Sequence, residues 1–131
     1  MASIFTKIIN GEIPCYKIAE DEHFFAFLDI SPLAKGHTLV VPKKEVDYIF
    51  DLEDERLSAM MVFSKKVARA IERSVPCTRM GIAVIGLEVP HCHIHLCPIS
   101  GLGDLDFKKE KLKLSAEEFI EIAQKIRNNL E

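Results

Sequence analysis

The 131-residue sequence has no long apolar run and no excess of positive charge, and each absence excludes a class of protein. No stretch approaches the roughly 20 apolar residues that span a bilayer, so we expect no membrane partner. Residues 1–7 lack the apolar core of a secretory signal, which predicts a cytoplasmic location. With 17 Lys and Arg against 20 Asp and Glu, the net charge of −3 argues against broad nucleic-acid binding, which needs a basic surface.

The four cysteines form no Cys-x-x-Cys pair, so they predict neither a redox motif nor a zinc knuckle. In a reducing cytoplasm they are expected to remain thiols and to pack as small hydrophobic residues. Hydrophobic residues make up 48% and charged residues 28% of the chain, as in an ordinary soluble protein. Length and composition together predict one globular domain, residues 1–131. A single nucleotide, which needs only a local pocket, is not excluded as a ligand.

The hydrophobic pattern predicts an α+β fold. Between residues 51 and 75, apolar positions recur at the three- and four-residue spacing of an amphipathic helix: Leu57, Met60, Met61, Ser64, Val67, Ala68, Ile71 and Val75. A final helix is predicted from Ser115, because Glu118 three residues later completes a capping box. A short helix over residues 3–10 would be capped by Ser3 and closed by Gly11 in a left-handed conformation.

Five strand-like segments accompany these helices, at residues 15–19, 24–28, 37–41, 81–85 and 92–98. The third is a β-branched run that we expect to stop at Pro42, which lacks a backbone donor. Hairpins separated by one long helix predict a five-stranded, mainly antiparallel sheet with that helix packed on it and short helices at both ends.

The run His91-Cys92-His93-Ile94-His95 holds three of the five histidines. Side chains alternate along a strand, so the three imidazoles would share one face, roughly 6–7 Å between neighbours, with Cys92 and Ile94 facing the core. A solvated, His-rich strand face is the simplest alternative, but exposed strand positions usually carry Lys, Glu or Thr.

Two chemistries could use such a row. Imidazole is a common ligand of zinc, copper and iron. A third histidine at this spacing usually points past the ion, however, so a metal site would need another ligand such as His37 or Glu88. Alternatively, a neutral histidine is a competent nucleophile near pH 7, with neighbours that fix its tautomer and stabilise charge.

The run His91-Cys92-His93-Ile94-His95-Leu96 resembles the motif of the histidine triad (HIT) family, in which three histidines alternate with apolar residues. Residues 3–14 resemble the family's opening segment, and residues 25–32 followed by 36–43 resemble its nucleotide-binding half. These matches keep the family order over residues 3–98, whereas the C-terminal part has no diagnostic pattern. Within the family, the chain resembles the histidine triad nucleotide-binding, purine nucleoside phosphoramidase branch.

The resemblance implies a nucleotidyl hydrolase, of the nucleoside phosphoramidase or dinucleoside polyphosphate hydrolase type. Its substrate would be a nucleoside 5′-phosphoramidate or related AMP or GMP conjugate, cleaved at the α-phosphate. By similarity, His93 attacks phosphorus and forms a nucleotidyl-histidine intermediate that water hydrolyses. His91 would orient this nucleophile, and His95 and His37 would hydrogen-bond the phosphate oxygens, where preorganised donors matter most.

Binding roles follow from the same resemblance. Asp29 would accept hydrogen bonds from the ribose, although a residue before Ser31-Pro32 is also a good turn former. The base would lie among four apolar residues, some of which could instead be plain core: Phe5, Ile8, Phe27 and Ile30. The family also implies a homodimer formed through the long helix and neighbouring strands. It implies no cofactor and no catalytic metal.

Two departures from the family pattern stand out. Ser3 and Thr6 occupy positions where many members carry zinc-binding cysteines, so we expect no structural zinc there. The loop before the triad is shortened, and Glu88 replaces a hydroxyl residue that helps to protonate the leaving group. Glu88 could be that acid if its pKa were raised, or simply a solvated loop residue. The altered loop leaves two alternatives open, a nucleotide-binding regulatory scaffold with weak catalysis and a metal-binding protein using His91, His93 and His95.

Overall fold

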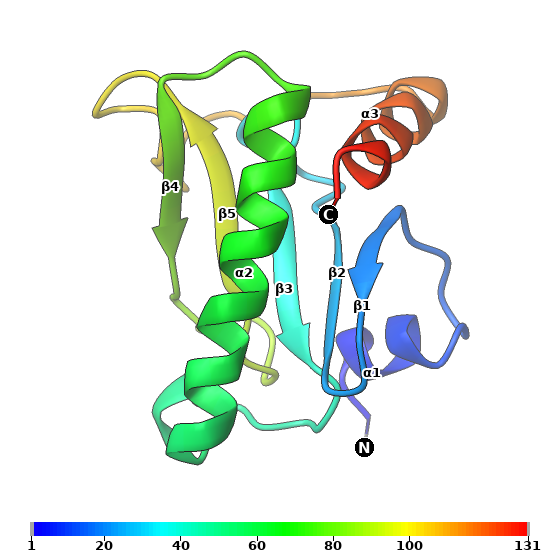
Figure 1. Cartoon of the computed structure of the whole chain (residues 1–131), viewed down its shortest axis with the longest axis vertical. Helices are drawn as coiled ribbons and strands as arrows, with labels where there is room; N and C mark the ends of the chain where they lie inside the picture. Colours follow the sequence, from blue (N-terminus) through cyan, green and yellow to red (C-terminus); the bar gives the residue numbers. More distant parts are fainter. Residues whose placement is uncertain (1, 131) are drawn as a thin grey trace.

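The computed structural model describes residues 2–130, which form a five-stranded sheet with helices on both faces (Figure 1). Met1 and Glu131, the ends of the expected domain, lie outside the described residues. In chain order the elements are α1 (Ile4–Ile9), β1 (Lys17–Glu20), β2 (Phe24–Leu28), β3 (Thr38–Pro42), the 3-10 helix η1 (Ile49–Asp51), α2 (Asp54–Ser74), β4 (Arg79–Ala83), β5 (Ile94–Ile99) and α3 (Ala116–Asn128).

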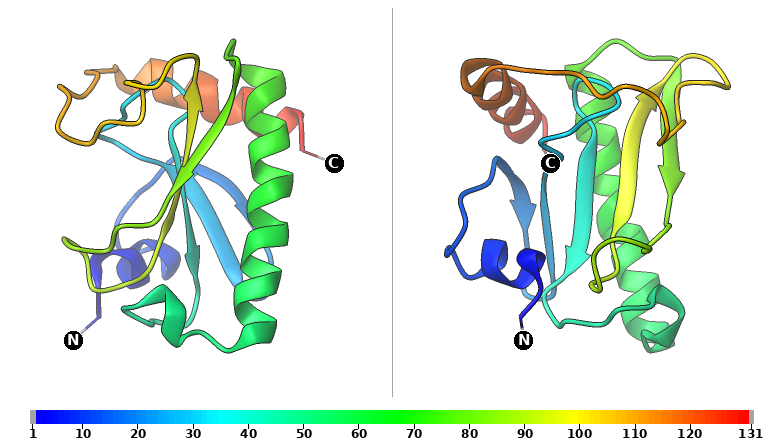
Figure 2. Two further views of the ribbon diagram at one scale, coloured as in Figure 1. Left: turned by 90° about the vertical axis from the view of Figure 1, so that its left-hand side faces the viewer. Right: turned by 180° about the vertical axis from the view of Figure 1, so that it is seen from behind.

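The strand order is β1-β2-β3-β5-β4, and every pairing is antiparallel. The central strands β3 and β5 are distant in sequence but adjacent in space, with Leu39 opposite His95. Helices α2 and α3 cover one face of the sheet, whereas α1 and the segment after β5 lie on the other (Figure 2). The predicted α+β class, the antiparallel sheet and the packing of the long helix are confirmed.

Two apolar layers hold these elements together. Phe24, Ala26 and Leu28 of β2 pack towards the helices, where Met60 and Ile71 of α2 are fully buried. On the opposite face a smaller layer lies under α1: Phe5, Phe25, Phe27, Leu39 and Val41. Every residue of β2 and β3 is buried, which explains why both segments read as continuous apolar runs rather than alternating ones.

The capping signals were good predictors of helix ends. The Ser3 side chain accepts from the Thr6 amide at the start of α1, and Gly11 after it has a φ of +80°. Ser115 and Glu118 form the expected capping box of α3. The apolar face of α2 was predicted less well, because Met61 is 48% exposed while Phe63 is buried. No helix among residues 2–130 is long and apolar enough to cross a membrane.

The segment around the histidines differs most from prediction. Strand β5 begins at Ile94 rather than Cys92, so His91 and His93 precede it. The reason is that the Cys92 amide donates to the carbonyl of Val46 (2.7 Å), in the loop after β3, and not to a sheet neighbour. Pro42 was expected to stop β3 but is its last residue, paired with Phe24. A strand end tolerates proline because no ladder donor is needed there.

Candidate active site

A cavity of about 420 Å³ opens on the α1 face of the sheet, and two of the three clustered histidines, His93 and His95, line it. Its walls come from α1, β3, the loop before β5 and the segment after β5. The other lining residues are Ile4, Phe5, Asp29, Ser31, Leu39, Ile85, Gly86, Leu87, Glu88, Val89, Phe107 and Lys111. This cavity therefore brings together residues from five separate stretches of the sequence.

His93 is held with one ring nitrogen free. Its Nδ1 lies 2.8 Å from the carbonyl oxygen of His91, and a carbonyl can only accept, so Nδ1 carries the proton. In the neutral ring the lone pair is then on Nε2. The Phe5 ring packs edge-on against His93, with centroids 5.0 Å apart, and limits its rotation. The ring is therefore oriented with an unprotonated nitrogen, the form in which imidazole can act as a nucleophile.

His91 supports this arrangement from behind. Its ring is fully buried, its Nε2–H donates to the Pro42 carbonyl (2.7 Å) and its Nδ1 accepts from Ser3 Oγ (2.7 Å). Burial lowers the pKa of His91, so the ring stays neutral. The Phe5 ring touches both His91 and His93, and Cys92 and Ile94 lie in the opposite core, as the alternation predicted. His91, however, is covered by α1 and does not line the cavity.

His95 and His37 form a second oriented pair. The Leu33 amide donates to His37 Nδ1 (3.0 Å), so the proton of neutral His37 is on Nε2. That Nε2–H lies 3.0 Å from His95 Nδ1 and donates to it. Neutral His95 must therefore carry its own proton on Nε2, as a donor at the cavity wall. His37 is 1% exposed, both of its ring nitrogens are engaged, and it is not among the residues that line the cavity.

Burial keeps this pair uncharged. It lowers the pKa of His95 to about 3, assisted by the neighbouring His93 and His37 rings. Burial also lowers the pKa of His37, although the nearby Asp29 carboxylate acts in the opposite direction. At neutral pH the two rings are therefore neutral, which is the state that the tautomer assignment requires.

Asp29 takes part in a turn and also lies at the cavity wall. Its Oδ1 accepts from the Ser31 amide (2.8 Å), which fixes the turn after β2. Its Oδ2 lies 3.7 Å from His37 Nε2, and the side chain is 20% exposed at the cavity wall. One carboxylate oxygen is thus available to a ligand hydroxyl.

The other expected binding residues are distributed differently. Phe5 lines the cavity, but Ile8 and Phe27 pack in the apolar layer beneath it, where the Phe27 and Phe5 ring centroids are 5.6 Å apart. Ile30 is 71% exposed and lies outside the cavity lining. Glu88 is an exposed residue of the cavity wall.

Comparison with known proteins agrees with this geometry. The family model described as HIT domain matches residues 10–101. An uncharacterised HIT-like protein of Borreliella burgdorferi is 37% identical, with 97% of each chain covered. The chain belongs to the HIT family. The adenosine 5′-monophosphoramidase of Schizosaccharomyces pombe is 38% identical to this HIT protein, covering 75% of the chain and 74% of the relative. The corresponding Saccharomyces cerevisiae protein is 40% identical, covering 74% and 62%.

The similarity extends to the fold of a solved structure. A Hit-like protein from Bartonella henselae described as involved in cell-cycle regulation superposes with a TM-score of 0.84 and 31% identity, covering 98% of this chain and 96% of that one. The predicted family is therefore confirmed by sequence and by fold.

Phe107 and Lys111 are among the residues of this HIT protein's cavity that were missed from sequence. The Phe107 ring lies 4.6 Å from the His95 ring, between centroids, and Lys111 Nζ donates to the Phe107 carbonyl (2.6 Å). Their segment is attached to the site because the Leu112 amide donates to the Pro32 carbonyl (2.9 Å). The only signal in the sequence is one aromatic residue in a lysine-rich stretch, too weak to predict a site.

The alternative of a metal held by His91, His93 and His95 has little geometric support. Among residues 2–130, the group whose donor atoms lie within 4.8 Å of one another is Asp29, His37 and His95. Two of those donors already share the His37–His95 hydrogen bond, which a metal would have to replace. Both ring nitrogens of His91 already have hydrogen-bond partners in the protein, the Pro42 carbonyl for Nε2 and the Ser3 hydroxyl for Nδ1.

Proposed function

We propose that this HIT protein hydrolyses a nucleoside 5′-phosphoramidate, or a related AMP or GMP conjugate, at the α-phosphate. The observation that carries the proposal is the hydrogen bond from His93 Nδ1 to the His91 carbonyl, which leaves Nε2 unprotonated beside His95 and Asp29. The two yeast relatives named adenosine 5′-monophosphoramidase support the substrate class.

In the first step, His93 Nε2 bonds to phosphorus and the bond from phosphorus to the leaving nitrogen breaks. The electron pair of that bond leaves with the amine, which takes up a proton. His93 becomes a positively charged nucleotidyl-imidazole, and the His91 carbonyl stabilises the charge through the Nδ1–H bond. In the second step, water attacks phosphorus, its proton is released and Nε2 regains its lone pair as the nucleoside monophosphate departs.

The His95 Nε2–H is placed to donate to a non-bridging phosphate oxygen. This donor is preorganised, because His37 and the Leu33 amide set the tautomer of His95 before the substrate binds. Catalysis on this account uses no metal and no cofactor.

Other residues of the cavity lining would orient the substrate. Asp29 Oδ2 accepts from the ribose hydroxyls, and Phe5 with neighbouring apolar residues contacts the base. Lys111, the one lysine or arginine among the described lining residues, offsets the negative charge of Asp29 and Glu88 near the phosphate. Glu88, which also lines the cavity, is proposed as the group that protonates the leaving amine.

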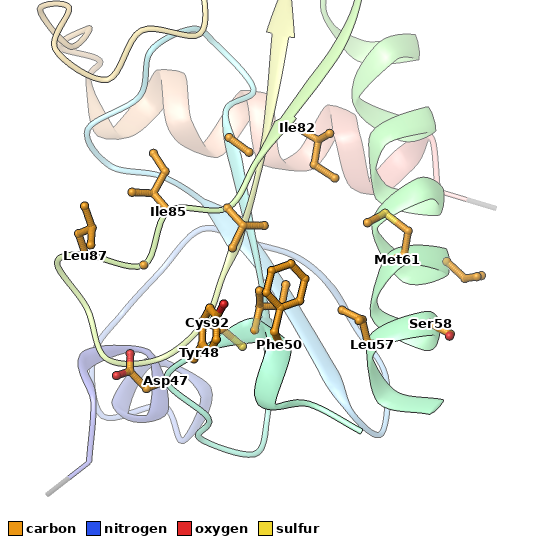
Figure 3. A pocket seen from close by; sticks show the side chains of 15 residues that line it. Asp47, Tyr48, Phe50, Leu57, Ser58, Met61, Ile82, Ile85, Leu87 and Cys92 are labelled. Carbon is orange, nitrogen blue, oxygen red and sulfur yellow. The ribbon is translucent and has the colours of Figure 1, made fainter. Parts of the chain in front are cut away.

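A homodimer is part of the proposal. A second cavity of about 1030 Å³ lies between α2, η1 and β4, with no histidine in its lining (Figure 3). Figure 3 shows Met61 and Leu57 of α2 facing Phe50 across this space, with the side chain of Ile82 of β4 extending towards α2. Several of its side chains are unusually exposed for apolar residues: Tyr48 57%, Phe50 70%, Val62 69% and Leu87 88%. Such a contiguous apolar surface is typical of a protein interface.

Turnover of adenosine 5′-phosphoramidate by the wild-type chain, His93→Ala and the control His23→Ala tests the function. We expect His93→Ala to abolish hydrolysis and His23→Ala to leave it unchanged, since His23 lies in the turn before β2 and away from the cavity. Tight AMP binding with wild-type turnover no faster than that of His93→Ala would instead identify a nucleotide-binding scaffold.

A further inference from the structure

A compact hydrogen-bonded cluster surrounds the buried His91 ring on the side away from the cavity. Ser3 Oγ lies 2.7 Å from His91 Nδ1, and Thr6 Oγ1 lies 3.4 Å from the same atom. Glu45, from the loop after β3, accepts from the Ser3 amide (2.7 Å) and from Thr6 Oγ1 (2.6 Å) through one carboxylate oxygen. The cluster joins α1 to the loop after β3 and both to the histidine run.

Every proton in the cluster can be assigned. The Pro42 carbonyl accepts from His91 Nε2–H, so Nδ1 of the neutral ring is an acceptor. Ser3 Oγ must therefore donate to it, and the same oxygen accepts from the Thr6 amide (3.1 Å). The Thr6 hydroxyl proton points to the Glu45 carboxylate, which can only accept. Thr6 is thus prevented from competing with Ser3 for His91.

Glu45 keeps its charge throughout the useful pH range. Hydrogen bonds from Thr6 and Ser3 hold the pKa of its carboxyl group at about 2. The carboxylate itself faces solvent, but the two groups it orders, Ser3 and the His91 ring, are buried. A surface carboxylate is therefore linked by hydrogen bonds to Ser3 and Thr6 and, through Ser3, to the buried His91 ring.

We propose that Glu45 is a positioning residue that, through Thr6 and Ser3, holds the buried His91 ring in place and so keeps the His91 carbonyl within hydrogen-bonding distance of His93. The tie works because the His91 ring anchors residue 91 to the end of β3, and the carbonyl that orients the nucleophile belongs to the same residue. Without Glu45, the Thr6 hydroxyl is free to donate to Ser3 Oγ, 3.3 Å away, or to His91 Nδ1. The catalytic part of this inference rests on the proposed function.

The state of the His91 ring nitrogens can be measured directly, without an activity assay. Nitrogen-15 NMR of the histidine rings at neutral pH should show His91 of the wild-type chain with Nε2 protonated and Nδ1 unprotonated. In Glu45→Ala the Pro42 carbonyl should keep the proton on Nε2, but the His91 Nδ1 signal should shift from its wild-type position because the hydrogen bond from Ser3 is disturbed. Glu45→Gln keeps an acceptor oxygen and should retain the wild-type signals. Wild-type signals in Glu45→Ala, or a Glu45→Gln spectrum as disturbed as that of Glu45→Ala, would overturn the inference.

A second variant separates positioning from folding. Ser3→Gly keeps a residue accepted at a helix N-cap but removes the hydroxyl donor, so α1 should persist while His91 Nδ1 loses its partner. We expect a shifted His91 Nδ1 signal, because the hydrogen bond from Ser3 is lost, with a melting temperature close to that of the wild-type chain. An unchanged His91 spectrum in this variant would contradict the proposed relay even if Glu45→Ala failed to fold.

Kinetics complete the test with a matched control. Glu45→Ala should lower kcat about 10- to 100-fold with KM little changed, as expected when a nucleophile is misplaced while the substrate still binds normally. Glu45→Gln should recover most of that activity. The control is Glu22→Gln, whose side chain is 87% exposed, and it should behave as wild type. If the wild-type chain hydrolyses no nucleotide conjugate, the proposed function fails while the NMR outcome still decides the role of Glu45.

Discussion

Nε2 of His37 lies 3.0 Å from Nδ1 of His95, and this contact sets the direction of a relay that starts at a backbone amide. Leu33 N–H donates to His37, His37 donates to His95, and His95 is left with a proton on the nitrogen that has no protein partner among the hydrogen bonds of the described residues. A fully buried residue thereby determines what a cavity-lining residue offers to a substrate.

Replacing His37 should damage catalysis while substrate binding is retained. His37→Leu replaces the imidazole by an apolar side chain of similar size. His95 is then free to carry its proton on Nδ1, the nitrogen that faces away from the phosphate. Since removing one oriented donor typically costs about 10²–10³ in rate, we expect a comparable fall in kcat with KM little changed. Steady-state kinetics on adenosine 5′-phosphoramidate measure both. His23→Gln, a histidine change outside the cavity, is the control, and a purely KM effect in His37→Leu would contradict the relay.

Burial of neutral histidines predicts how stability depends on pH. The pKa of His95 is lowered to about 3 and that of His37 is also lowered, so below the ordinary histidine pKa the unfolded chain binds protons that the folded chain does not. The contribution of these neutral histidines to the free energy of unfolding is therefore complete above about pH 6.5. It falls as the pH drops towards 3, by up to about 1.4 kcal/mol per pH unit for each histidine.

Urea unfolding between pH 7 and pH 4.5 measures this dependence. In His95→Gln the fall in unfolding free energy with decreasing pH should be smaller than in the wild-type chain, because one buried titrating group is gone. Identical pH dependence in the two proteins would show that His95 is not held neutral by the fold.

The role of Glu88 depends on the leaving group. Glu88→Gln cannot donate a proton, so we expect about a 10²-fold loss of rate with a poorly leaving amine and little loss with a phenolate that needs no protonation. Comparing adenosine 5′-phosphoramidate with a phenyl ester of AMP separates the two cases. Equal rates and unchanged pH profiles for wild type and Glu88→Gln on both substrates would reduce Glu88 to a solvated loop residue.

The exposed apolar surface gives a test of assembly. Val62 on α2 is 69% exposed and lines the second cavity, so Val62→Glu places a charge in the proposed interface. Analytical ultracentrifugation should show a dimer for the wild-type chain and a monomer for Val62→Glu. Leu102→Glu is the matched control, since Leu102 is fully exposed outside that cavity. A monomeric wild-type chain, or a dimer that survives Val62→Glu, would remove this surface as the interface.

Much of the fold could be predicted because local signals agreed with it. The capping residues Ser3 and Ser115 marked the beginnings of two helices, and the three- and four-residue spacing gave the long helix. Met61 was assigned to the wrong face because α2 carries apolar residues on a second side, and periodicity alone does not distinguish a core face from an exposed apolar one.

The site was less predictable because its geometry depends on contacts between distant segments. Alternation along the histidine run predicted that Cys92 and Ile94 would face the core, and they do. It could not predict that α1 covers His91, since that depends on Ser3, 88 residues away in sequence. Phe107 and the direction of the His37–His95 hydrogen bond were inaccessible for the same reason.

The central claim is that the free nitrogen of His93 becomes bonded to phosphorus during turnover. The wild-type chain should be mixed with an AMP phosphoramidate labelled at phosphorus, quenched within one turnover in alkaline denaturant, and mapped by peptide. The account predicts label on the peptide that contains His93, and none in His93→Ala. Label on Cys92 or Cys97, or rapid hydrolysis with no labelled protein at any time, would contradict it.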